Sequence, residues 1–152
     1  MPVDPDQARA LTLAPITVTV ERDRLRFFAK AVGETDPVYV DLDAARRAGH
    51  PDLPVPPTFF FSLDMERPDP WGYLAELGVD LRRVLHGEQS FTYHSMVHAG
   101  DTVALRSRIV DVYAKRGGAL EFLVRRTDVT RGGDLVAEAT SVIVVRNPEV
   151  PR

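Results

Sequence analysis

The sequence predicts one α+β domain in which an antiparallel sheet of about five strands wraps around a single central helix. Residues 58–65 are apolar on nearly every side, which is typical of a helix enclosed by other elements. From residue 83 onward, apolar and polar residues alternate with the period of a strand. Glycine-containing turns at 99–101, 117–118 and 132–133 divide that region into strands of about ten residues.

The elements before the central helix follow from local patterns. Residues 1–14 show no periodicity, so we expect a flexible N-terminal arm, followed by a domain over 15–147 and a tail over 148–152. Alternating apolar residues at 16–20 predict a short strand. The next apolar residues are spaced as one face of a helix that ends at Gly33, and they are Leu25, Phe28, Ala29 and Val32.

Turn and cap residues predict the approach to the central helix. Asp41 is expected to cap a short helix that stops at Gly49. Several prolines between 51 and 57 favour an extended chain, and Pro57 fits the first turn of the central helix because its missing N–H is harmless there. A further short helix is predicted over 71–77.

The composition excludes several classes of function. A chain of 152 residues with a net charge of −3 and dispersed Lys and Arg has no basic face, so we expect no binding to nucleic acid or membrane. The absence of cysteine excludes disulfides, thiolate metal sites and a cysteine nucleophile. The first twenty residues contain no apolar run typical of a signal peptide or membrane span, so we expect a cytoplasmic protein.

The segment over 28–39 carries the clearest functional motif. It reads Phe-Ala-Lys-Ala-Val-Gly-Glu-Thr-Asp-Pro-Val-Tyr and resembles the active-site loop of MaoC-like hydratases and dehydratases, roughly G-D-x-N-P-[IVL]-H. Gly33, Pro37 and Val38 keep the framework of that loop. Glu34 stands at the position of the family Asp, Asp36 at the Asn and Tyr39 at the His.

The resemblance extends over about residues 15–146. Asp41 and the short helix after it match the family spacing, and Pro57 stands where the family has the Gly that opens the central helix. Residues 85–94 and 97–102 resemble a variant branch, the FAS1-like dehydratase half of two-domain MaoC proteins. That branch includes the non-catalytic partner subunits of heterodimeric 3-hydroxyacyl-thioester dehydratases. The resemblance implies a single hotdog fold that pairs with another into a double hotdog.

The resemblance also implies a role for each altered position. In the family, the loop Asp and His are the acid/base pair and the Gly amide donates to the thioester oxygen. Glu34 is longer than Asp by one methylene, the hydroxyl of Tyr39 has a reference pKa of about 10, and Pro57 has no N–H. The preferred interpretation is a partner subunit without the usual dyad, while a separate catalytic hotdog subunit supplies the acid and base.

The expected site therefore combines degenerate catalytic positions with substrate-binding ones. Glu34 and Tyr39 occupy the catalytic positions. The expected substrate-binding residues are Asp36, Thr58, Phe59 and His86. The substrate would be an acyl thioester of coenzyme A or of acyl carrier protein. A plainer interpretation places the acidic residues in a turn, Tyr39 at a polar rim and Phe59 in the core.

Three alternatives stay open from the sequence. A homodimeric hydratase would use Glu34 with Tyr39 or His86. A hotdog thioesterase would use Asp64 on the central helix, although we expect Asp64 to lie past the buried stretch beside Glu66 and Arg67. The third alternative is a protein that binds acyl thioesters without catalysis.

The histidines do not predict a metal site. His50 is expected in a surface turn between Gly49 and Pro51. His94 and His98 are four residues apart, but on a strand and its following turn they do not share a face, so no zinc pair is implied. We expect neither a metal nor a cofactor.

Overall fold

The computed structural model describes residues 2–148 of the chain. In this part of the chain the helices are α1 (Pro5–Ala10), α2 (Arg22–Ala31), α3 (Leu42–Arg47), α4 (Phe59–Asp64) and α5 (Gly72–Glu76). The 3₁₀ turns are η1 (Pro37–Tyr39), η2 (Leu81–Arg83) and η3 (Arg116–Gly118). The strands are β1 (Ile16–Thr19), β2 (Val84–Tyr93), β3 (Thr102–Lys115), β4 (Leu120–Arg131) and β5 (Asp134–Arg146).

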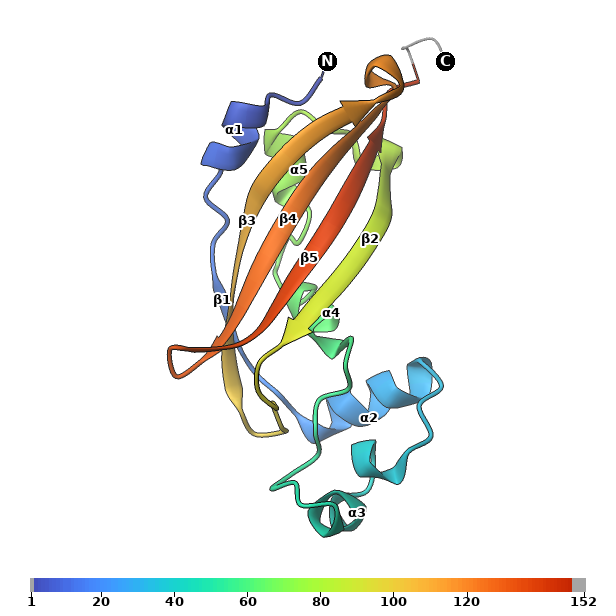
Figure 1. The fold of residues 1–152 in the computed structure, drawn as a ribbon, viewed down its shortest axis with the longest axis vertical. Coiled ribbons are helices and arrows are strands. Elements are labelled where there is room, and N and C mark those ends of the chain that lie inside the picture. Colours follow the sequence, from blue (N-terminus) through green and yellow to red (C-terminus); the bar gives the residue numbers. More distant parts are fainter. Residues whose placement is uncertain (1, 149–152) are drawn as a thin grey trace.

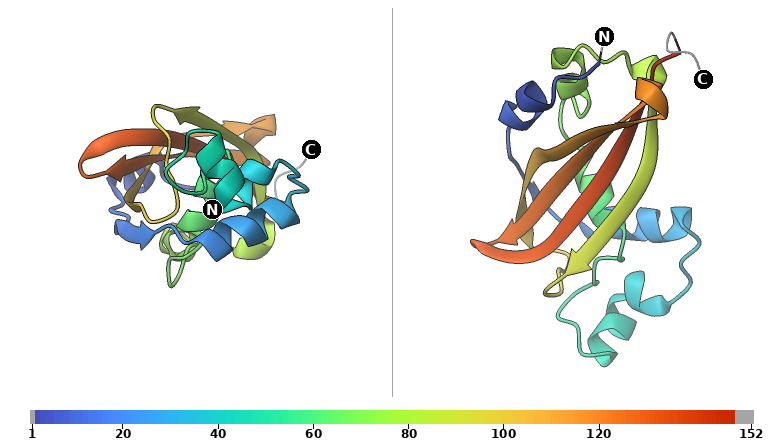
Figure 2. Two further views of the ribbon diagram at one scale, coloured as in Figure 1. Left: turned by 90° about the horizontal axis from the view of Figure 1, so that it is seen from below. Right: turned by 45° about the horizontal axis from the view of Figure 1, so that its top comes forward.

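The strands form one antiparallel five-stranded sheet in the order β1-β3-β4-β5-β2 (Figure 1). The sheet curves around α4, which lies against its concave face (Figure 2). Helices α2 and α3 lie together beyond one end of the sheet, and α1 and α5 lie near the other end. This is the single hotdog fold, so the expected fold class is confirmed.

The predicted capping residue at the start of α3 and the predicted glycines after α2 and α3 lie where the structure has these helix ends. The Asp41 carboxylate accepts hydrogen bonds from the amides of Asp43 and Ala44, which satisfies two donors at the start of α3. Gly33 and Gly49 follow α2 and α3 with φ of 73° and 93°, a left-handed conformation that glycine adopts without strain.

The start of α4 differs from the prediction. The helix begins at Phe59, with Thr58 as its N-cap residue, and it is six residues long. The amide of Phe59 donates to the carbonyl of Pro56 over 3.0 Å, so Pro57 occupies a turn before the helix rather than its first turn. The helix therefore begins two residues later than the pattern indicates.

The N-terminal arm contains a helix that the sequence analysis did not predict. Asp4 caps α1 by accepting from the amides of Asp6 and Gln7, with Pro5 as its first residue. Val3 and Ala8 are buried, and the Val3 amide donates to the buried Glu121 carboxylate over 2.8 Å. Packing against the sheet thus orders this segment despite its lack of periodicity. The division at 14 and 147 stays a prediction, and tail residues 149–152 lie outside the described part.

A row of polar side chains divides the core into two apolar clusters. One cluster surrounds Phe59 and α2, and the other surrounds α5 and α1. The polar row crosses four strands on the concave face, where the Ser107 and Thr127 hydroxyls are 2.8 Å apart and Ser141 donates to the Gln89 amide oxygen. Buried Arg125 belongs to the same row, since it pairs with Ser141 across β4 and β5.

Candidate functional site

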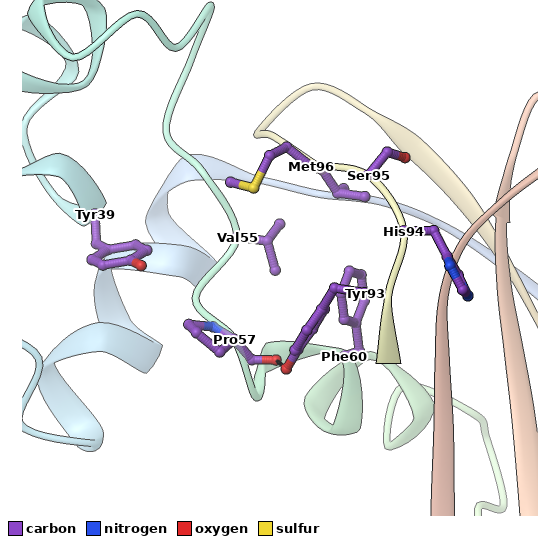
Figure 3. A pocket seen from close by; sticks show the side chains of 9 residues that line it. Tyr39, Val55, Pro57, Phe60, Tyr93, His94, Ser95 and Met96 are labelled. Atoms are coloured by element: carbon purple, nitrogen blue, oxygen red, sulfur yellow. Dashed lines mark hydrogen bonds between the residues drawn. The ribbon is translucent and has the colours of Figure 1, made fainter. Parts of the chain in front are cut away.

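The first cavity opens beside the start of α4 and has a volume of about 380 Å³. It joins the loop that resembles the hydratase motif to the segment before α4 and to the end of β2 (Figure 3). Its lining is mainly apolar and comprises Tyr39, Val55, Pro57, Phe60, Tyr93, His94, Ser95, Met96 and Val97. We name it the α4 N-terminal cavity.

Tyr39 is the one residue of the altered loop that lines this cavity. Its side chain is half-buried on η1, and its ring lies across the cavity from Val55 and Pro57 (Figure 3). Burial raises the pKa of Tyr39, and the carboxylates of Glu34 and Asp36 raise it further. Its hydroxyl therefore stays protonated at neutral pH and can donate a hydrogen bond but cannot act as a base there.

Glu34 and Asp36 direct their carboxylates to the backbone of their own loop. Glu34 Oε1 accepts from the amides of Thr35 and Asp36, each over 2.9 Å. Asp36 Oδ1 accepts from the Val38 amide over 3.0 Å and caps η1. Neither side chain lines the cavity, so the geometry is that of two local turns.

The residue before the N-cap of α4 presents its carbonyl to the cavity as an acceptor. The carbonyl of Pro57 accepts from the Tyr93 hydroxyl, and both residues line the cavity (Figure 3). Thr58 is exposed outside the lining, whereas Phe59 is 1% exposed and packs edge-to-face on Phe28. Phe59 is thus a core residue. The cavity wall on α4 is formed by the next residue, Phe60.

His86 does not reach the α4 N-terminal cavity. It is exposed on β2 and stacks on Phe61 with ring centres 5.3 Å apart. Tyr93 and Met96 do line it and were not predicted from the sequence. The alternation of β2 gave a signal for Tyr93, because it lies two residues after Phe91 and therefore on the same face of the strand.

The other histidines make specific contacts. His50 is half-buried rather than a simple surface residue, and its Nδ1 lies 3.1 Å from Nε2 of His98. Burial lowers the pKa of His98, and His50 lowers it further. His94 Nε2 lies 2.7 Å from the Glu138 carboxylate, and its ring points away from the cavity (Figure 3). Among the described residues, no group of three or more His, Cys, Asp or Glu could hold a metal ion.

The expected position of Asp64 is wrong. Its side chain is 9% exposed and lies in the core, where it forms ion pairs with Arg67 and with Arg125 of β4. The two arginine charges offset the desolvation cost of burying the Asp64 carboxylate, which is why a charged residue is tolerated on this apolar helix. Both oxygens of Asp64 are engaged by these arginines.

The fold and the cavity at the start of its helix define a hotdog protein of the MaoC-like class. A family model described as "FAS1-like, dehydratase domain region" matches residues 8–139. The chain therefore belongs to this FAS1-like branch of the MaoC-like hotdog family. It is 36% identical to a UPF0336 protein of Parafrankia sp. (strain EAN1pec) over 158 residues, which covers 100% of both chains.

Two structures from Mycobacterium tuberculosis are similar over most of the chain. The HadBC (3R-hydroxyacyl-ACP dehydratase) complex gives a TM-score of 0.75 at 28% identity, covering 88% of this chain and 93% of that one. The ChsH1-ChsH2 complex gives 0.75 at 26% identity, covering 95% and 94%. Within residues 2–148, no helix is long and apolar enough to cross a membrane.

Proposed function

We propose that this chain is a partner subunit, without the usual acid/base dyad, of a MaoC-like (R)-3-hydroxyacyl-thioester dehydratase or enoyl-thioester hydratase. It pairs with a catalytic hotdog subunit that carries an intact loop, and it shapes the acyl-binding space of the pair. The observation that carries this proposal is the Glu34 carboxylate, which is bound to two amides of its own loop and lies outside the cavity lining.

The chemistry of hydration supports this assignment. Adding water to an enoyl thioester requires a base for the water, an acid for the α-carbon and donors for the developing enolate oxygen. Tyr39 has a raised pKa, which removes it as a base at neutral pH. Pro57 stands at the position of the family Gly but has no N–H, and its carbonyl accepts from the Tyr93 hydroxyl.

The edge of the sheet supports pairing with a second hotdog. Strand β2 is ten residues long and lies last in the sheet, so its outer side has no partner strand among the described residues. Leu85, Tyr93 and Met96, on or just after this strand, are 51%, 48% and 51% exposed. An edge of this length with apolar side chains beside it is typical of a strand that is covered by another subunit. The two similar structures are complexes of differently named chains.

The thioesterase alternative has no support from the geometry. A catalytic carboxylate must reach the substrate, whereas Asp64 is enclosed by Arg67 and Arg125 and does not line the α4 N-terminal cavity. The experiment described next distinguishes the proposed function from a homodimeric hydratase and from a non-catalytic binding protein.

The test compares the chain alone with the chain co-expressed with a hotdog protein that carries an intact Gly-Asp loop. Crotonyl-CoA and the matching crotonyl-acyl carrier protein serve as substrates, with hydration followed by loss of enoyl absorbance and hydrolysis by thiol release. We expect no turnover by the chain alone and hydration by the pair. The faster of the two substrates identifies the carrier.

A matched pair of variants assigns the catalytic residues. Glu34→Gln in this chain should leave the activity of the pair within about twofold, because a glutamine oxygen can still accept from the loop amides. Replacing the loop Asp of the partner by Asn should abolish hydration. Turnover by the isolated chain that disappears in Glu34→Gln would establish the homodimeric hydratase instead. Thiol release by the isolated chain would establish the thioesterase instead.

A further inference from the structure

A second cavity, of about 310 Å³, lies at the other end of α4. Its walls come from the linker between α1 and β1 with the first residue of β1, from the turn between α4 and α5, from α5 itself, and from β4. Leu13 and Ile16 contribute apolar surface, and Arg67, Tyr73 and Arg125 contribute polar groups. We name it the α4 C-terminal cavity. Its volume is at the lower end of the range for small-molecule sites.

Two buried donors at this cavity lack a hydrogen-bond partner among the described residues. They are Nε of Arg125, whose side chain is 4% exposed, and the hydroxyl of Tyr73, which is 6% exposed. The guanidinium carbon of Arg125 lies 5.3 Å from the centre of the Tyr73 ring, which is a cation–π contact. The Nη2 atom of Arg125 is engaged by Asp64 and Ser107. The unused Nε of Arg125 thus belongs to a side chain that is otherwise fixed in place.

Both unused groups can donate a hydrogen bond to an acceptor. Burial raises the pKa of Tyr73, so its hydroxyl stays protonated, and an arginine does not lose its proton in proteins. Leaving a buried donor unpaired costs about 1–3 kcal/mol, and native structures contain few such groups. An oxygen atom that accepts from both groups would remove this cost.

The charges around the cavity favour a neutral acceptor. Arg67 and Arg125 are opposed by Asp64 in the core, and Asp69 and Glu76 also line the cavity. These five groups together carry no excess positive charge, so a carboxylate or phosphate would gain little electrostatic energy on entering. A carbonyl oxygen accepts two hydrogen bonds without bringing a charge.

We propose that the α4 C-terminal cavity binds a compact, mainly apolar molecule through a neutral carbonyl oxygen, which accepts hydrogen bonds from the Tyr73 hydroxyl and Arg125 Nε. The apolar walls at Leu13 and Ile16 hold the rest of the molecule. This site is separate from the α4 N-terminal cavity, and it does not depend on the partner-subunit proposal.

Three probes with the same six-membered ring test the site: cyclohexanone, its isostere methylenecyclohexane, and cyclohexanecarboxylate. Binding to the full chain is followed by amide chemical shifts in nuclear magnetic resonance spectra. We expect cyclohexanone to bind roughly 25-fold more tightly than methylenecyclohexane, because each of the two hydrogen bonds contributes about fivefold. The carboxylate should bind more weakly than the ketone, and the shifts should map to residues around Tyr73.

The variant Tyr73→Phe separates ligand recognition from folding. It removes an unpaired hydroxyl and keeps the ring, so its free energy of unfolding should not fall, while its preference for the ketone should fall about fivefold. Tyr113→Phe is the control, because Tyr113 is stacked on Phe122 and does not line the cavity. Equal binding of ketone and isostere, no binding of either, tightest binding of the carboxylate, or no effect of Tyr73→Phe would each overturn the proposal.

Discussion

Glu34 and Asp64 are carboxylates whose negative charges are balanced in opposite ways. Glu34 accepts from amides one and two residues along the chain, in an exposed loop. Asp64 pairs with arginines 3 and 61 residues away, in the core. The first arrangement forms from local sequence alone, whereas the second exists only once α4 has packed on β4.

The comparison shows how burial changes the part that a carboxylate plays. In the loop, water can replace a lost partner, so Glu34 contributes mainly turn geometry. In the core, no water replaces Asp64, and two arginine charges depend on it. The residue at the catalytic position of the family motif is therefore the less critical of the two for the fold of this chain.

The largest expected effect is that of Asp64→Asn. This change keeps the size of the side chain but leaves Arg67 and Arg125 without their counterion, so we expect the free energy of unfolding to fall by about 3–5 kcal/mol. Urea denaturation measures it. Asp23→Asn is the control, because the Asp23 carboxylate is 95% exposed and pairs with Arg26 at the surface. Equal losses in the two variants would contradict the contrast between a buried and an exposed carboxylate.

A smaller effect is expected for Glu34→Ala. The variant removes the acceptor of two loop amides, which water can solvate, and changes of this kind at caps cost about 1 kcal/mol. Glu34→Gln should retain most of this stability, because its side-chain oxygen still accepts. The same urea titration compares both variants. A loss from Glu34→Ala as large as that from Asp64→Asn would mean that the loop is more tightly coupled to the core than its hydrogen bonds indicate.

The smallest effect concerns Asp52 at acid pH. The hydrogen bond from Arg22 is the main cause that lowers the pKa of Asp52 to about 2. Because the folded value lies below the unfolded one, the pair stabilises the fold above about pH 4, and this stability disappears as the pH falls through about 2. The Arg22 side chain is 45% exposed, so solvent screens the pair and the change should be smaller than that of Glu34→Ala.

Arg22→Gln isolates this contribution. The variant should lose less stability than the unmodified chain between pH 4 and pH 2, as measured by urea midpoints at a series of pH values. A parallel decline in both proteins would show that other carboxylates dominate acid unfolding.

Local features could be predicted from the sequence because their signals are local. The caps of α2 and α3 and the altered loop were found from residue types at fixed spacings, and the sheet was found from its alternation. Pro57 was expected in the first turn of α4 but lies two residues before it, because a proline indicates a helix start without fixing its register. The helix α1 was missed because Val3 and Ala8 are ordered by a sheet that lies far along the chain.

The candidate site was harder to predict from the sequence, because it too depends on contacts between distant segments. The α4 N-terminal cavity joins Tyr39, Phe60 and Tyr93, and their meeting depends on how the loop and β2 pack around α4. One signal was available for the partner of Asp64. Leu123, Arg125 and Val129 share the strand period of β4, so an arginine was predictable on the buried face and needed an acid opposite it.

The two edges of the sheet differ in a way that limits how far assembly can proceed. Strand β2 offers ten residues to a neighbour, while β1 at the opposite edge is four residues long and directly follows Pro15. A chain of sheets that grows without end needs two strong edges on every copy. In the proposed pair, two β2 edges would meet and the outermost strands would be the short ones, and short edges beside proline resist further addition. Such a pair would be closed and protected against fibre growth.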